Sequence, residues 1–283
     1  MITAIFEYEF LRNTFITGLL IGIIAPLLGT FLVVRRLSLI ADALSHVTLA
    51  GIAASLFLSK KTLLFSGLNP LFMGMGFSVF GSILIERLRT VYSHYQELAI
   101  PIILSGGIGV GVIFISLADG FNTELLNYLF GSVSAVTRTD LWVIAAISVV
   151  VIVVVFLLYK ELFLLSFDEE HAKAAGIPSK FIHFVFIIMI ALVIAASIRI
   201  VGILLVSALM SLPVAAGMRV ANGFKKTIFI SILFGETAVV GGLVSAYYLD
   251  LAPGGTIVII SILILLGAII YKRIYHQIQL KFH

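Results

Sequence analysis

Apolar runs of about 20 residues, separated by short polar stretches, repeat along the whole chain. A helix needs roughly 20 apolar residues to cross a hydrocarbon core about 30 Å thick. The runs therefore predict an all-α bundle of about nine, that is eight to nine, membrane-crossing helices. The predicted segments are residues 10–34, 38–58, 67–85, 98–117, 141–159, 182–198, 200–218, 227–249 and 255–271. Only Arg199 separates the sixth and seventh segments, so one of these two is expected to be broken or tilted.

The composition supports a membrane protein. Of the 283 residues, 61% are hydrophobic and only 11% are charged, and the mean hydropathy is +1.21. A soluble domain needs more charge than this to cover its surface. The sequence contains no long hydrophilic block, so we expect a single transmembrane domain over residues 1–283 and no separate catalytic domain. The lack of cysteine excludes disulfides and thiolate metal sites.

The basic residues indicate how the chain is oriented. The net charge is +4 and the pI is about 9.3, but Lys and Arg lie at the ends of apolar runs, which indicates membrane orientation and not nucleic-acid binding. With the N-terminus outside, 13 of the 18 basic residues fall on the cytoplasmic side. The positive-inside rule therefore predicts that the C-terminus and the 160–181 loop of this multi-pass protein are cytoplasmic.

Three ionisable residues lie well inside apolar runs, where a charge costs at least about 2.5–3.5 kcal/mol. Asp42 and His46 are four residues apart, which puts both on one helix face, about 6 Å apart along the axis. A carboxylate and an imidazole suit Zn²⁺ or Mn²⁺. The alternative is structural: Asp42 hydrogen-bonds a neighbouring helix and His46 packs as a neutral ring. Glu236 is a third ligand, a proton acceptor, or a partner of Arg199 or of a helix end.

The loop between the fifth and sixth segments contains a short predicted helix within residues 167–178. Asp168 is a natural N-cap, and Glu169 and Glu170 favour the positive end of a helix. Gly176 ends it. Such a helix either packs against the bundle or docks on a cytosolic partner, and its clear boundaries favour docking. The residues expected to carry this contact are Asp168, Glu169, Glu170, Ala172 and Gly176.

Four stretches of the chain resemble the ABC-3 family of metal-ion permeases. The first resembles the family pattern R-x-x-S-L-x-G-D-A-I-S-H-A, and the second resembles its S-F-D-x-E-x-A-x-x-x-G-x-P loop. The four stretches are Val34–His46, Phe167–Pro178, Val201–Leu209 followed by Pro213, and Tyr247–Val258. Their order and the chain length also match the family, so the resemblance extends over nearly the whole sequence.

The resemblance implies a type II ABC importer-like permease that carries zinc or manganese into the cell by alternating access. It implies a homodimer, cytosolic ABC ATPase subunits and an extracytoplasmic metal-binding protein that delivers the ion. No cofactor is expected to stay bound, because the metal is cargo. Asp42 and His46 would contribute to a metal site in the path, and residues 168–176 would dock on the ATPase.

Other functions leave sequence signatures that can be sought. No Walker A pattern and no HExxH pattern occurs, so neither ATP hydrolysis nor zinc-protease chemistry is expected of this chain. An ATP-independent secondary transporter or channel remains an alternative, although such proteins often contain inverted repeats and no convincing one is present. An ABC permease for an organic metal chelate is the other alternative.

Overall fold

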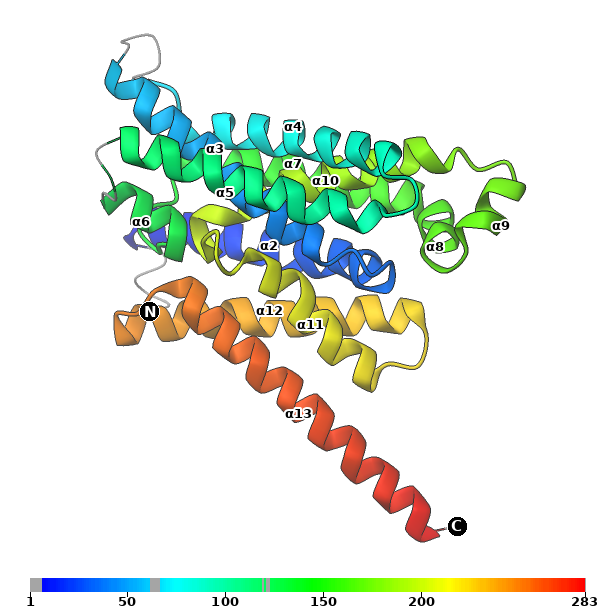
Figure 1. Cartoon of the computed structure of the whole chain (residues 1–283). Helices are drawn as coiled ribbons and strands as arrows, with labels where there is room; N and C mark the ends of the chain where they lie inside the picture. Colours follow the sequence, from blue (N-terminus) through cyan, green and yellow to red (C-terminus); the bar gives the residue numbers. More distant parts are fainter. Residues whose placement is uncertain (1–6, 62–66, 119, 121–122, 283) are drawn as a thin grey trace.

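The computed structural model describes residues 7–61, 67–118, 120 and 123–282. Over these residues the chain is helical, with short turns and no β-strand, which confirms the predicted all-α fold. The α-helices are α2 (Glu9–Val34), α3 (Leu39–Lys61), α4 (Pro70–Val91), α5 (Ala99–Leu117), α6 (Thr123–Phe130), α7 (Arg138–Leu157), α8 (Tyr159–Phe167), α9 (Glu169–Ala174), α10 (Ser179–Val201), α11 (Val206–Val220), α12 (Phe224–Leu249) and α13 (Pro253–Phe282). Most of the long helices lie side by side in one bundle, whereas α13 leaves it at an angle and its C-terminal half projects away (Figure 1).

Eight described helices are long and apolar enough to cross a membrane, and α11 is a shorter apolar helix of 15 residues. At 1.5 Å per residue α11 is about 22 Å long, less than the hydrocarbon thickness. These nine helices correspond to the nine predicted segments. The seventh segment was expected to be broken or tilted if the sixth was not; it forms α11, a continuous helix that is short instead.

The boundary between these two segments lies elsewhere than predicted. Arg199 is inside α10, and the chain breaks after Val201 at Gly202, whose φ is +82°. Only glycine takes this conformation at little cost. The backbone N–H of Ile203 donates to the Tyr128 carbonyl at 2.9 Å, so the end of α6 takes up a hydrogen bond at the break. The placement at Arg199 was wrong because the fold supplies partners for this charge within a helix.

Two further helices, α6 and α8, were not predicted. Each has fewer than ten residues, too short to give the hydropathy signal of a crossing helix. The α6 helix buries Leu125, Tyr128 and Leu129. The α8 helix follows α7 directly, where a loop was expected, and leads into α9 at one end of the bundle (Figure 1).

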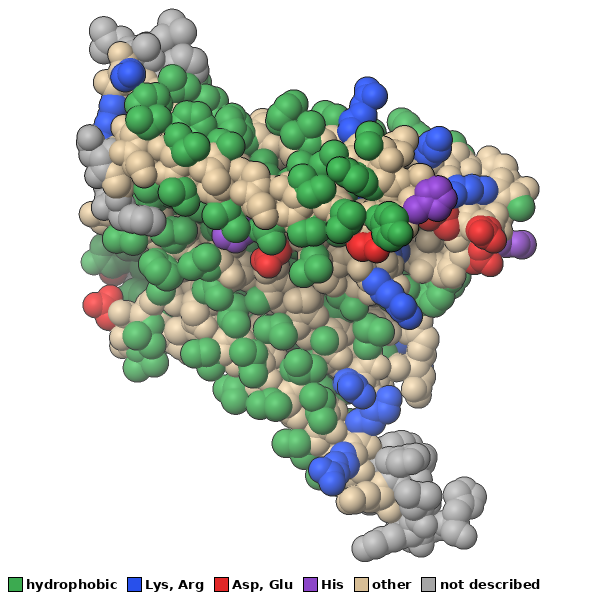
Figure 2. All heavy atoms as spheres, in the orientation of Figure 1, with side chains coloured by type: hydrophobic (Ala, Val, Ile, Leu, Met, Phe, Trp, Pro, Cys, Tyr) green, Lys and Arg blue, Asp and Glu red, His purple; other side chains and the backbone are tan. Residues whose placement is uncertain are grey.

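The centre of the bundle is formed by α2, α3 and α10. In these helices 72–83% of the most apolar window is buried, against 22–39% in the other crossing helices. The outer helices instead expose large apolar side chains, such as Trp142 and Phe156 on α7. Figure 2 shows a largely hydrophobic surface with Lys and Arg gathered mainly toward the end that carries α9. Lipid is the solvent that such a surface requires, so the chain is a multi-pass membrane protein.

Candidate functional site

Asp42 and His46 lie one turn apart near the start of α3. Their sequence neighbours Ala41, Ala43 and Leu44 are fully buried, whereas Asp42 and His46 are half-buried. The two polar side chains therefore share the side of α3 that the bundle does not seal.

A serine on another helix holds the carboxylate. The Ser207 hydroxyl donates to Asp42 Oδ1 at 3.0 Å. Ser207 is the second residue of α11, so the break between α10 and α11 is what brings it to α3. This bond is the contact that the structural interpretation of Asp42 predicts, but it occupies one oxygen. Within the described residues, Oδ2 of Asp42 and the ring of His46 make no hydrogen bond, which leaves both available as metal ligands.

Glu236 lies on a different helix from this pair. It sits on α12 against α2, where a Cβ added to Gly22 would come within 2.8 Å of Glu236 Oε1. That oxygen is buried and has no hydrogen-bond partner in the described part of the chain. No group of three or more His, Cys, Asp or Glu side chains able to hold a metal occurs among the described residues. One chain thus brings together Asp42 and His46, and Glu236 does not join them in this conformation.

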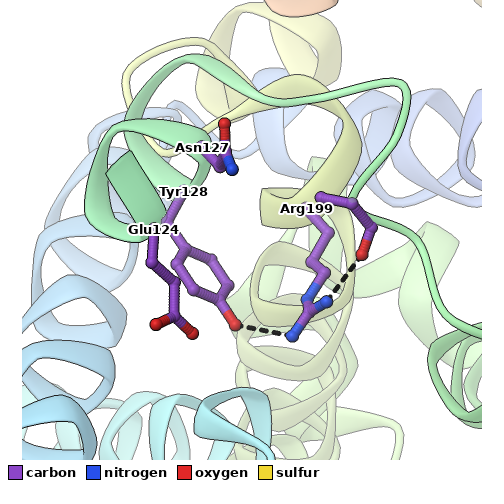
Figure 3. A pocket seen from close by; sticks show the side chains of 5 residues that line it. Glu124, Asn127, Tyr128 and Arg199 are labelled. Carbon is purple, nitrogen blue, oxygen red and sulfur yellow. Dashed lines mark hydrogen bonds between the residues drawn. The ribbon is translucent and has the colours of Figure 1, made fainter. Parts of the chain in front are cut away.

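The suggestion that Glu236 pairs with Arg199 is wrong, because Arg199 has other partners. Its Nη1 lies 3.1 Å from Oδ2 of Asp140, a fully buried carboxylate on α7. Nη1 also donates to the Ala135 carbonyl at 2.7 Å. Nη2 donates to the hydroxyl of Tyr128 at 2.7 Å, as Figure 3 shows.

This cluster fastens four helices together. Asn69, the N-cap of α4, accepts from Arg199 Nη2 at 3.0 Å and donates to Asp140 Oδ1 at 2.8 Å. Thr137 caps α7 and donates from its backbone and its hydroxyl to Asp140 Oδ2. Burial raises the pKa of Tyr128 to about 12, so the phenol stays neutral beside the guanidinium. Sequence reasoning missed the cluster because its members are far apart in the chain, and Asp140 looks like an ordinary residue at a helix start.

The predicted helix between α7 and α10 forms as expected, over Glu169–Ala174. The Asp168 carboxylate accepts from the His171 N–H at 2.8 Å, as an N-cap does. At the other end Gly176, with φ +80°, donates to the Lys173 carbonyl, and Ile177 donates to Ala172. These two bonds form a Schellman motif.

The faces of α9 differ in burial. Ala172 is fully buried, whereas Glu169, Glu170 and Lys173 are exposed. The Lys173 ammonium lies 2.8 Å from Glu169, and its hydrogen bond lowers the pKa of that carboxyl. The helix is therefore anchored by one alanine and presents charged residues outward.

Known proteins resemble this chain over nearly its whole length. The model of the ABC 3 transport family matches residues 7–272. A probable metal transport system membrane protein of Treponema pallidum is 35% identical, over 95% of this chain and 97% of that protein. The manganese import system permease protein ScaB of Streptococcus gordonii is 33% identical, over 94% of this chain and 92% of that protein.

Solved structures agree with these matches. PsaBC from Streptococcus pneumoniae, in complex with Fab, superposes with a TM-score of 0.82 at 31% identity, over 94% of this chain and 93% of that one. An inward-facing putative metal-chelate type ABC transporter has a TM-score of 0.63 at 19% identity, over 92% and 85% of the two chains, and shows a shared fold.

A bundle of membrane-crossing helices with an ionisable pair on a central helix agrees with a transport permease. The chain belongs to the ABC 3 transport family and is the membrane subunit of an ABC importer.

Proposed function

We propose that this permease imports a divalent metal ion, Mn²⁺ before Zn²⁺, and that Asp42 and His46 bind the ion during its passage. The observation that carries the proposal is the half-buried pair on α3, with Asp42 accepting a hydrogen bond from Ser207. Manganese is preferred because relatives over 30% identical are named as manganese permeases. An oxygen and an imidazole nitrogen suit Mn²⁺ and Zn²⁺ alike, so the ligand types do not decide between the two ions.

Two ligands from one chain suit a transient site better than a structural one. A structural zinc site closes four ligands around the ion, whereas the described residues offer no group of more than two. The remaining positions are left for water or for the same pair on a second copy, because we expect a homodimer. Weak binding lets the ion leave when the bundle opens to the other side.

We further propose that ATP is hydrolysed by a separate cytosolic ABC ATPase subunit, on which α9 docks. The support is the form of α9, a well-capped helix with charged residues facing outward. In the proposed orientation α9 and the C-terminus face the cytoplasm of a bacterial cell. They lie at the same end of the bundle in Figure 1, which agrees with the count of basic residues. An extracytoplasmic metal-binding protein would deliver the ion at the opposite end.

The test is metal uptake in cells that carry the wild-type chain or His46→Ala, with Mn²⁺ and Zn²⁺ offered separately. His46→Ala should lose most uptake of the transported ion at unchanged membrane abundance. His94→Ala is the matched control, because His94 is exposed in the turn before α5 and bonds only Ser93. Wild-type uptake of both metals by His46→Ala would refute the assignment. Loss of zinc uptake alone would refute the preference for manganese.

A further inference from the structure

A polar pocket of about 210 Å³ opens beside α9, away from the metal-binding pair. Its lining comes from the C-terminal end of α4, the first turns of α10, α9 itself, and Arg35 in the turn between α2 and α3. The ionisable residues of the lining are Arg35, Glu86, Arg89, Glu169, Lys173, Lys180 and His183. With His183 neutral, four cations face two carboxylates.

Both carboxylates already have partners. Glu86 Oε2 lies 3.2 Å from His183 Nε2 and 3.9 Å from Arg89 Nη1. Glu169 is paired with Lys173 at 2.8 Å. Each carboxylate thus lies near one cation, Arg89 for Glu86 and Lys173 for Glu169.

Arg35 forms no ion pair within the described residues, although the charges of Glu169 and Glu86 act on it from within the pocket. Its guanidinium lies over the ring of Phe186, 5.5 Å from the centroid, and its Nη1 is buried with no hydrogen-bond acceptor in the described residues. Burial, and then the charge of Arg89, lower the pKa of Arg35 to about 10, so it still carries its charge at neutral pH. A buried, charged donor without an acceptor is costly, and a bound anion would remove that cost.

The surroundings of the pocket point to a lipid as the source of the anion. In the proposed orientation the pocket lies at the cytoplasmic membrane surface. Tyr92, Tyr95 and Phe181, next to the lining residues in sequence, are exposed, as aromatic residues at a membrane–water interface are. Phe80 and Val91 on α4 are also exposed and offer an apolar surface for acyl chains. Basic pockets between helices on this side of a membrane are typical of anionic lipid sites.

We propose that this pocket binds the phosphate of an anionic phospholipid of the cytoplasmic leaflet, with Arg35 and Lys180 as the main phosphate ligands. The proposal rests on the orientation given under the proposed function. Arg35 is four residues before α3, which carries Asp42, and Glu169 and Lys173 belong to α9. A bound headgroup therefore contacts both the docking helix and the turn that leads into the metal-binding helix.

The test measures lipid binding without metal or ATP, so it can fail independently of the uptake test. The full chain is purified, placed in nanodiscs with equal amounts of phosphatidylcholine and phosphatidylglycerol, and its retained lipids are counted by native mass spectrometry. Arg35→Gln should retain about tenfold less phosphatidylglycerol than wild type, because a charge-assisted hydrogen bond is lost. Arg36→Gln is the control, because Arg36 is the next residue but lies outside this pocket.

A second variant guards against misfolding. Lys180 is exposed, so Lys180→Gln should fold normally and should retain about fivefold less phosphatidylglycerol. Equal retention by wild type, Arg35→Gln and Lys180→Gln would overturn the proposal. It would also be overturned if inorganic phosphate, measured by thermal shift, bound in an Arg35-dependent way while phosphatidylglycerol did not. Displacement of the lipid by the purified ATPase subunit would identify the pocket as a slot for a partner's carboxylate and would likewise overturn it.

Discussion

Replacing Arg199 by methionine should destabilise the bundle strongly. Methionine keeps most of the side-chain volume but removes the charge and every donor. Arg199 is 13% exposed and Asp140 is fully buried, so the change leaves a buried carboxylate without its counter-ion. Breaking a buried pair in this way costs about 3–5 kcal/mol. The Ala135 carbonyl and the Tyr128 hydroxyl also lose a donor.

Thermal unfolding of the detergent-purified protein measures this loss. A cost of about 3–5 kcal/mol corresponds to a fall in Tm of roughly 10 °C for a domain of this size. Arg138→Met is the matched control, because Arg138 is the exposed first residue of α7 and should change Tm by little. The double variant Arg199→Met with Asp140→Asn should recover part of the loss, because it removes the unpaired charge.

Two results would refute this reasoning. A Tm of Arg199→Met equal to that of Arg138→Met would mean that the cluster contributes little to stability. If the Tm of the double variant is no higher than that of Arg199→Met, the loss of stability comes from packing and not from the unpaired Asp140 charge.

Two other predictions concern Asp42 and the chain reversals. Ser207→Ala should weaken metal uptake about tenfold without changing membrane abundance, because Asp42 loses its orienting donor. Ser211→Ala is the control and should not weaken uptake, because it removes only a hydrogen bond within its own helix. Equal uptake by both variants would count against the role of Ser207. Gly202→Ala should abolish folding, because its Cβ would lie 2.5 Å from the Leu129 carbonyl. Gly176→Ala has open space and should cost only about 1 kcal/mol, so similar membrane abundance of the two glycine variants would show that crowding at Gly202 is unimportant.

Much of the fold could be predicted because the solvent is lipid. A helix that crosses hydrocarbon must satisfy its own backbone hydrogen bonds, so each long apolar run corresponds to one helix. The ends of α9 could also be predicted, because they depend on residues close in sequence. Asp168 accepts from the N–H of His171, and Gly176 donates to the carbonyl of Lys173. Such features need no knowledge of distant contacts.

The break after Val201 and the cluster around Arg199 could not be predicted in this way. Gly202 ends α10 where the end of α6 accepts a hydrogen bond, and α6 is about 70 residues earlier in the chain. Arg199 looked like a boundary because a lone charge in an apolar run normally marks one. Its partners at the N-cap of α4 and on α6 and α7 offset the cost of burying this charge inside a helix.

The sequence by itself determined the all-α membrane fold, the family, the pairing of Asp42 with His46 on one helix face, and the capped helix α9. All of these depend on residues within a few turns of one another, where helix geometry alone sets the distances. Only the tertiary structure decided four relations. Ser207 donates to Asp42, Glu236 forms no three-residue metal group with the pair in the described residues, Asp140 neutralises Arg199, and Arg35 has a buried donor without an acceptor. These relations depend on how helices distant in sequence pack together, and the hydropathy pattern does not predict which helices contact each other.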